Sequence, residues 1–109
     1  MSVSVSFFDL EIRVGTIIKA EIFEKAKKPA YKLTITFGEF GIRKSSAQIT
    51  ENYLCEELLG RQVIALLNVP PKNIAGFLSE CLVLAALDDI NGTILLKPDK
   101  KVADGMRIS

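Results

Sequence analysis

Basic side chains are concentrated in one stretch of the chain, where they could neutralise phosphate groups of a ligand. Residues 19–44 hold seven of them against three acidic residues, whereas residues 45–60 hold three glutamates and no basic residue. The seven are Lys19, Lys25, Lys27, Lys28, Lys32, Arg43 and Lys44. Because the formal net charge of the chain is only +1, the sequence predicts a local basic edge rather than a generally basic protein.

The side chains that usually carry catalysis and metal binding are scarce. The chain has no histidine, which removes the commonest general base and the commonest zinc ligand. Cys55 and Cys81 lie far apart in apolar surroundings, so we expect two buried thiols rather than a disulfide or a zinc site. Lys44 and Ser46 share a strand face, but no other group completes a nucleophilic site. We therefore expect a non-catalytic protein with no metal and no cofactor.

Composition and the N-terminal residues favour a single cytoplasmic domain over residues 1–109. Of the 109 residues, 49% are hydrophobic and 25% are charged, which suits one globular core. The opening MSVSVSFFDL lacks the basic and long apolar regions of a secretory signal, and two unpaired thiols favour a reducing compartment. No stretch approaches the roughly 20 apolar residues that cross a bilayer, so we expect no membrane insertion.

Alternating apolar residues predict the strands that position the basic residues. Even positions are mostly apolar from residue 12 to 22, which predicts a long half-buried strand over residues 12–23, bent or bulged at Gly15. The phase then moves to odd positions, and Lys32, Thr34 and Thr36 occupy the other face of this second strand. Its inward residues are Tyr31, Leu33, Ile35 and Phe37. Residues 38–41 predict a hairpin turn that leads into a more polar strand over residues 42–46.

A short helix is expected over residues 50–59, after the third strand. Thr50 is a suitable N-cap, and Gly60 is a natural stop. The side chains expected to face the core are Leu54, Leu58 and Leu59.

The remaining pattern completes a barrel. Strands are expected over residues 62–68 and 80–87, and Asn91-Gly92 predicts a hairpin turn with a return strand over residues 93–97. The first strand is long enough to serve two sheets, and one helix separates the third strand from the fourth. This order predicts an all-β, five-stranded Greek-key OB-fold barrel with a C-terminal hairpin extension.

An OB-fold barrel binds its ligands on one face and through the adjoining loops. Here that face would carry Lys32, Thr34, Thr36, Arg43 and Lys44, flanked by the lysine-rich loop over residues 25–28. Aromatic stacking residues are scarce, because the chain has no Trp and only Phe40 and Phe77 fall in exposed segments. Two interpretations remain open: a phosphate-binding face, or a solvated strand face that keeps the protein soluble and protects a sheet edge.

Three separated motifs resemble the tRNA-binding OB domain family. They are LEIRVGTI at residues 10–17, KSSAQI at residues 44–49, and NVPPK, IAGF and SE within residues 68–80. That family includes the C-terminal extension of methionyl-tRNA synthetases, a part of phenylalanyl-tRNA synthetase beta chains, and free-standing dimers. The length of the chain and the residues of these motifs are most similar to the CsaA-like branch of the family. This branch comprises small homodimers described as export-related chaperones.

The resemblance implies a surface for nucleic acid or another ligand, built from the basic strands and the loop before Ser79. Its candidate residues are Lys27, Lys28, Lys32, Arg43, Lys44, Ser45, Ser46, Gln48, Lys72, Asn73, Phe77 and Ser79. Family members often have a second basic residue after Lys72, where this chain has Asn73, so phosphate contact by this loop is weakened. For Glu80 we expect a structural clamp, satisfied by backbone N–H groups or by a basic neighbour such as Arg13 or Lys44.

The resemblance also implies a homodimer, and the sequence favours one independently. The expected strand over residues 80–87, residues 94–96, and Val3, Val5, Phe7 and Phe8 together expose more apolar surface than a small barrel covers. The alternative is that the C-terminal hairpin forms a flap over the barrel's own open end. The partners implied are tRNA, unfolded preprotein peptides, and a synthetase or the export machinery. Binding of tRNA by shape, binding of unfolded preproteins, and a scaffold or tRNA-delivery role for a synthetase all remain open.

Overall fold

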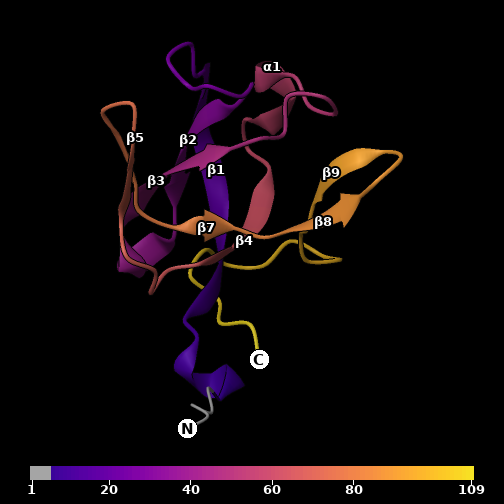
Figure 1. Cartoon of the computed structure of the whole chain (residues 1–109). Coiled ribbons are helices and arrows are strands. Elements are labelled where there is room, and N and C mark those ends of the chain that lie inside the picture. Colours follow the sequence, from indigo (N-terminus) through magenta and orange to yellow (C-terminus); the bar gives the residue numbers. More distant parts are fainter. Residues whose placement is uncertain (1–5) are drawn as a thin grey trace, which may run out of the picture.

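Five antiparallel strands form a sheet that curls into a nearly closed barrel in the computed structural model, which describes residues 6–109 (Figure 1). They are β1 (Ile12–Ile22), β2 (Tyr31–Thr36), β3 (Ile42–Ala47), β4 (Gln62–Leu66) and β7 (Leu82–Val83). Their order in the sheet is β3-β2-β1-β4-β7, so the long β1 pairs with β4 along its first half and with β2 along its second. The predicted OB-fold is confirmed.

Two hairpins and three short helical turns complete the architecture. The hairpins are β5 (Lys72–Ile74) with β6 (Phe77–Ser79), and β8 (Ala85–Asp88) with β9 (Gly92–Leu95). The helical turns are η1 (Phe7–Asp9), η2 (Gly38–Phe40) and α1 (Cys55–Leu58). In Figure 1 the β5–β6 hairpin stands beside β3, and the β8–β9 hairpin projects from the opposite side of the barrel. None of the helices within residues 6–109 is long and apolar enough to cross a membrane.

The barrel core comes from the alternation in β2 and from single residues of its neighbours. Leu33, Ile35 and Phe37 are fully buried, which confirms the odd phase predicted for this strand. Ile17, Leu58 and Val63 pack against them from β1, α1 and β4. Tyr31 is buried as well, and its hydroxyl donates a 2.8 Å hydrogen bond to the carbonyl of Tyr53.

The irregularity in β1 lies at Ile18 and not at the predicted Gly15. The pairing of β1 with β2 slips between Ile17 and Lys19, which leaves Ile18 as the extra residue of a β-bulge. The even phase predicted for this strand holds at Ile12 and Val14, but Ile17 is fully buried and Ile18 and Ile22 are exposed. Gly15 serves another purpose, because a Cβ at that position would lie 2.6 Å from the Phe37 ring. The glycine lets the ring pack directly on the strand.

The helix is shorter than predicted. It runs from Cys55 to Leu58, so Thr50 is not its N-cap, and the first helical turn is closed by Leu54, whose N–H donates to the Glu57 carboxylate at 2.9 Å. Only Leu58 of its three leucines is buried. The preceding residues have other partners: the Asn52 amide donates to the carbonyls of Asn91 and Thr93, and the Tyr53 hydroxyl accepts from Leu95 N–H.

The strand predicted over residues 80–87 is divided in two at Leu84. Its N–H donates to the Ile64 carbonyl on one side, and its carbonyl accepts from Leu96 on the other. The chain therefore leaves β4 at this point and pairs with β9 instead. The predicted hairpin around Asn91-Gly92 is confirmed, with residues 89–91 as its connection and a return strand shorter than expected.

Candidate nucleic-acid interface

The free edge of β3 is covered by two side chains from the segment that follows β5. Ser79 Oγ accepts a 3.1 Å hydrogen bond from the N–H of Ser46, and Glu80 Oε1 accepts one of 3.1 Å from the N–H of Lys44. The N–H of Glu80 also donates to the Lys44 carbonyl at 2.7 Å. The expected clamp role of Glu80 is therefore confirmed, and its partner is the backbone of β3 rather than a basic side chain.

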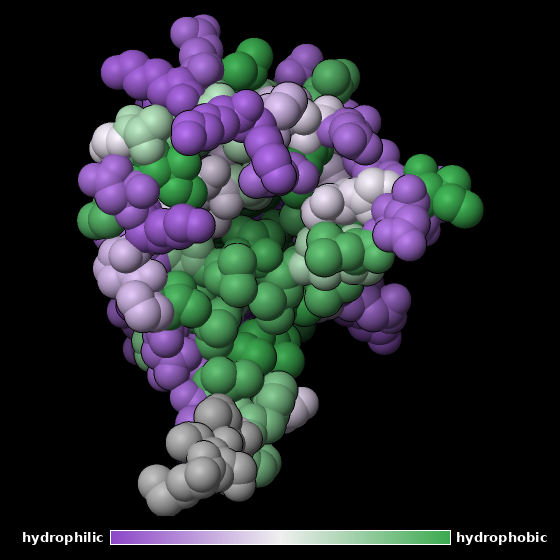
Figure 2. All heavy atoms as spheres, in the orientation of Figure 1, coloured by the Kyte–Doolittle hydropathy of each residue, from purple (hydrophilic) through white to green (hydrophobic). Residues whose placement is uncertain are grey.

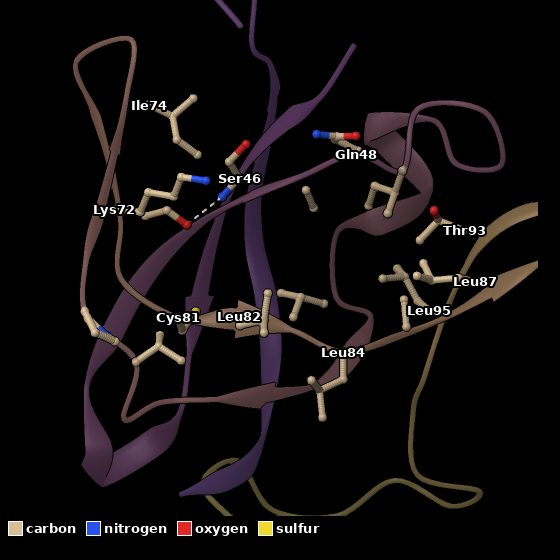
Figure 3. A pocket seen from close by; sticks show the side chains of 17 residues that line it. Ser46, Gln48, Lys72, Ile74, Cys81, Leu82, Leu84, Leu87, Thr93 and Leu95 are labelled. Atoms are coloured by element: carbon tan, nitrogen blue, oxygen red, sulfur yellow. Dashed lines mark hydrogen bonds between the residues drawn. The ribbon is translucent and has the colours of Figure 1, made fainter. Parts of the chain in front are cut away.

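This contact aligns four strands into one transverse row. Lys32 of β2 lies opposite Ser46 of β3, and Ser79 of β6 lies opposite Lys72 of β5. The hydrogen bond between Ser46 and Ser79 joins these two pairs, and Figure 3 shows the Lys72 side chain reaching towards Ser46. We call these four residues the basic row, since a lysine residue stands at each end of it.

Further predicted residues surround the basic row. Lys44 is exposed and shares the outer face of β3 with Ser46, and Gln48 is exposed just beyond that strand. Lys27 and Lys28 are exposed in the loop between β1 and β2, at the top of Figure 1, where Figure 2 shows hydrophilic side chains. The ion pairs found within residues 6–109 are Arg13 with Glu11 and Lys19 with Glu21, so these lysines are not neutralised by one.

Three predicted residues point elsewhere. Arg43 has the inward phase of β3, and its guanidinium donates to the Leu67 carbonyl at 3.1 Å. Ser45 is 1% exposed, and its hydroxyl donates to the Ser46 carbonyl. The Asn73 side chain accepts a 2.9 Å hydrogen bond from Gly76 N–H and so shapes the β5–β6 turn. The structure therefore does not bring these three side chains to the basic row.

An apolar groove of about 630 Å³ adjoins the basic row. Lys72, Ser46 and Gln48 lie along its upper side in Figure 3, and β7, β8 and β9 supply its apolar walls. The labelled apolar residues that line it are Ile74, Leu82, Leu84, Leu87 and Leu95. Figure 2 shows the same region as a hydrophobic area that extends towards the N-terminal turn.

The β8–β9 hairpin leaves several of its large apolar residues exposed. Leu95 belongs to the barrel core, but Leu87 is 83% exposed and Ile90 at the hairpin tip is 92% exposed. Ile94 and Leu96 are exposed as well. Phe7 and Phe8 are also exposed, whereas Val3 and Val5 lie outside the described residues.

Sequence reasoning missed the β5–β6 hairpin and the groove beside it. The turn is formed by Ala75 and Gly76, which have φ values of 47° and 86°, as in a type I′ hairpin turn. Ala-Gly is a weaker signal than Asn-Gly, and the flanking strands have only three residues each. The available signal was the pair of apolar residues on either side of Ala75-Gly76, since Ile74 and Phe77 lie opposite each other in the hairpin.

Both thiols are free, as expected, but only Cys81 is buried, whereas Cys55 is half-buried. Burial raises the pKa of Cys81 to about 11, and burial together with Glu56 raises the pKa of Cys55. Within residues 6–109 there is no group of three or more His, Cys, Asp or Glu side chains that could hold a metal ion.

Comparisons with known proteins agree with this geometry. A family model described as "Putative tRNA binding domain" matches residues 12–107. The structure superimposes on chaperone CsaA from Bacillus anthracis with a TM-score of 0.89 and 44% identity, over 98% of this chain and 100% of that one. For CsaA from Picrophilus torridus the TM-score is 0.88 and the identity 45%, over 97% and 100% of the two chains.

Among curated proteins, the methionine–tRNA ligase of Methanococcoides burtonii is 39% identical over 99 residues, which is 91% of this chain and 14% of the ligase. The ligase of Methanothrix thermoacetophila is 43% identical over 103 residues, or 94% of this chain and 15% of the ligase. The chain thus spans about a seventh of the length of these curated relatives.

Proposed function

The chain belongs to the family of tRNA-binding domains and is CsaA-like within it, and on that premise we propose that it binds tRNA without acting on it chemically. Binding would take place in the cytoplasm, where the two free thiols stay reduced. The basic row, Lys44 and the lysines of the β1–β2 loop would contact the RNA.

The observation that carries this proposal is the alignment of Lys32, Ser46, Ser79 and Lys72 across four strands. Such a row has one lysine on β2 and one on β5, beside the exposed loop that carries Lys27 and Lys28. Lysines contact phosphates as point charges and carry no direct sequence information. Recognition would therefore rest on the shape of the folded RNA and on its phosphates.

We further propose that the protein works as a homodimer. The exposed side chains Leu82, Leu87, Ile94 and Leu96 lie on or next to the walls of the groove, and a second copy would cover them. Two copies would double the basic surface offered to one folded RNA, which strengthens binding without any new type of contact.

A second candidate function rests on the apolar groove. Its volume of about 630 Å³ and its leucine-rich walls suit apolar side chains of an unfolded preprotein, and the solved relatives with this fold are titled chaperones. Peptide binding of this kind depends on apolar contact, so it would tolerate salt. The protein would then be an export-related chaperone.

A third role is that of a scaffold or tRNA-delivery module for a synthetase. The relatives that support it are methionine–tRNA ligases, which contain this domain as a small part of a longer chain. It needs the same RNA contacts together with a synthetase partner.

Charge reversal in the lysine-rich loop and at the neighbouring Lys32 of β2 tests the tRNA proposal. We expect Lys27→Glu, Lys28→Glu and Lys32→Glu together to abolish binding of labelled tRNA at about 50 mM salt. The matched control reverses Lys97, Lys100 and Lys101, which are also exposed and lie in the C-terminal segment at the opposite end of the barrel in Figure 1. An equal loss of tRNA binding in both triple variants would contradict a localised interface, because the net charge alone would then explain binding.

A further inference from the structure

A small aromatic pair lies outside the barrel core, next to the basic row. The rings of Phe23 and Phe77 meet edge to face with centroids 5.3 Å apart. Phe23 is buried and Phe77 is half-buried, but neither belongs to the core cluster or packs against it. The pair therefore lies apart from the core cluster, and Phe77 as a residue remains partly accessible to solvent.

Positive charge surrounds this pair. The Lys32 ammonium lies 5.7 Å from the Phe23 centroid and 5.8 Å from the Phe77 centroid, within the range of cation–π attraction. The lysine-rich loop begins and ends here, because Phe23 N–H donates to the Ala30 carbonyl and the Phe23 carbonyl accepts from Ala26. Lys27 and Lys28 are carried on this same loop.

The backbone holds Phe77 in a fixed position. It is the first residue of β6, directly after the type I′ turn at Ala75 and Gly76. Two residues later, Ser79 ties β6 to β3 through its hydrogen bond with Ser46. Because the backbone is fixed on both sides of Phe77, this residue loses little conformational freedom when a ligand binds, which favours affinity.

We propose that Phe77 and Lys32 form a subsite for one unpaired nucleotide of the bound RNA. The base stacks on the open part of the Phe77 ring, and its phosphate meets the Lys32 ammonium. Every base has a π-face, so such stacking is tolerant of sequence, and it requires a base that is free of a helix. This inference rests on the proposed tRNA binding, and it adds that a loop or an end of the RNA is gripped together with its phosphates.

The test places a fluorophore at the subsite. Because the chain contains no Trp, Phe77→Trp supplies the only indole of the protein. We expect its fluorescence to be quenched by tRNA and by a short single-stranded RNA, but not by a blunt RNA duplex of the same length. The control is Phe40→Trp, since the Phe40 ring already lies under the Arg13 guanidinium, 3.7 Å from ring centroid to Cζ. Its fluorescence is expected to stay unchanged.

A second variant measures the contribution to affinity. Phe77→Leu keeps an apolar side chain against Phe23 but removes the stacking surface, so we expect labelled tRNA to bind about 5- to 150-fold more weakly. Thermal unfolding of the same variant separates lost stacking from lost folding. If Phe77→Leu unfolds at the assay temperature, the fluorescence of Phe77→Trp decides whether a base stacks at this position.

The outcomes separate this inference from the function on which it rests. If labelled tRNA binds the wild-type protein, but the indole at position 77 is not quenched and Phe77→Leu binds as tightly as wild type, the subsite is wrong and tRNA binding stands. Quenching by the blunt duplex as strongly as by the single strand would also overturn the proposed subsite, because an unpaired base would not be needed. If the wild-type protein binds no tRNA, both proposals fail.

Discussion

Glu80 and Lys44 are joined by two hydrogen bonds that tie β3 to the residue between β6 and β7. The Glu80 N–H donates to the Lys44 carbonyl at 2.7 Å, and the Glu80 carboxylate accepts from the Lys44 N–H at 3.1 Å. The side chain thus takes the place of a strand partner for β3. A charge at the entrance of the apolar segment 81–87 is explained by this contact, since the carboxylate satisfies a sheet edge.

Removing the carboxylate is expected to weaken the fold. Glu80→Ala should lower the free energy of unfolding by about 1–2 kcal/mol, because the β3 edge loses a charge-assisted hydrogen bond. Glu80→Gln keeps an acceptor and should cost less. Urea unfolding measures both, with Glu24→Ala as the control at an exposed glutamate. Equal stability of Glu80→Ala and wild type would show that the contact contributes nothing.

Gly15 and Phe37 are expected to be energetically coupled. A Cβ at position 15 would meet the Phe37 ring at 2.6 Å and Ile35 at 2.7 Å, so Gly15→Ala should destabilise by about 1–3 kcal/mol through overpacking. Phe37→Leu leaves room for the added methyl group. The double variant should therefore be more stable than the sum of the two single effects predicts, by roughly 0.5 kcal/mol or more. Simple additivity in a double-mutant cycle would contradict the close contact.

The two thiols should differ in reactivity. Cys81 is buried and its pKa is about 11, so at pH 8 only about one in a thousand of these groups is ionised. Cys55 is half-buried, with its pKa raised by burial and by Glu56. We expect iodoacetamide to modify Cys55 first and Cys81 only after denaturant is added, as judged by peptide mass analysis. Faster modification of Cys81 in the native protein would refute its burial.

The same thiol predicts a pH dependence of stability. Its folded-state pKa of about 11 lies above the ordinary value of 9.0, so the folded state keeps a proton that the unfolded state releases between these values. Stability from this group is complete below about pH 9 and is lost as the pH rises towards 11. The loss should be on the order of 2 kcal/mol and should be absent from Cys81→Ala. Identical pH profiles of the two proteins would exclude this contribution.

A dimer through the exposed leucines predicts a change of mass on substitution. Leu82→Asp with Leu87→Asp should convert a species of twice the chain mass into a monomer, measured by light scattering during gel filtration. Ile42→Asp is the control, because Ile42 is 61% exposed, between Leu82 at 51% and Leu87 at 83%, but does not line the groove. A wild-type protein that is monomeric at micromolar concentration would remove the proposed dimer.

Much of the barrel could be predicted because its signals are local. The odd phase of β2 is a complete period-two pattern, and Leu33, Ile35 and Phe37 are buried as it predicts. The irregularity of β1 could not be placed, because glycine is typical of bulges and also of close packing, and Gly15 does the latter. The predicted helix was longer than the observed one because local pattern and distant contacts disagree before Cys55. Asn52 and Tyr53 fit a helical pattern, but their side chains bind the β8–β9 hairpin, which is distant in sequence.

The candidate site, like the fold, could be predicted from the sequence only in part. Lys32 and Lys44 lie on the outer face as the alternation indicates, but Arg43 shares the inward phase and binds the Leu67 carbonyl at the barrel end. The basic row depends on the contact of Ser46 with Ser79, which joins segments 33 residues apart. No local pattern encodes such a contact, so only the family resemblance placed Lys72 with the β2–β3 face, and the structure shows the contact that brings them together.

The most direct test of the central claim is a titration of labelled total tRNA with the purified protein at about 50 and 200 mM salt, the range in which phosphate contacts become visible. We predict micromolar binding at the lower concentration that weakens steeply at the higher one, because the basic row and the loop lysines displace counterions from the RNA. No binding at about 50 mM salt would contradict tRNA binding by this protein and would make the peptide-binding groove its working function.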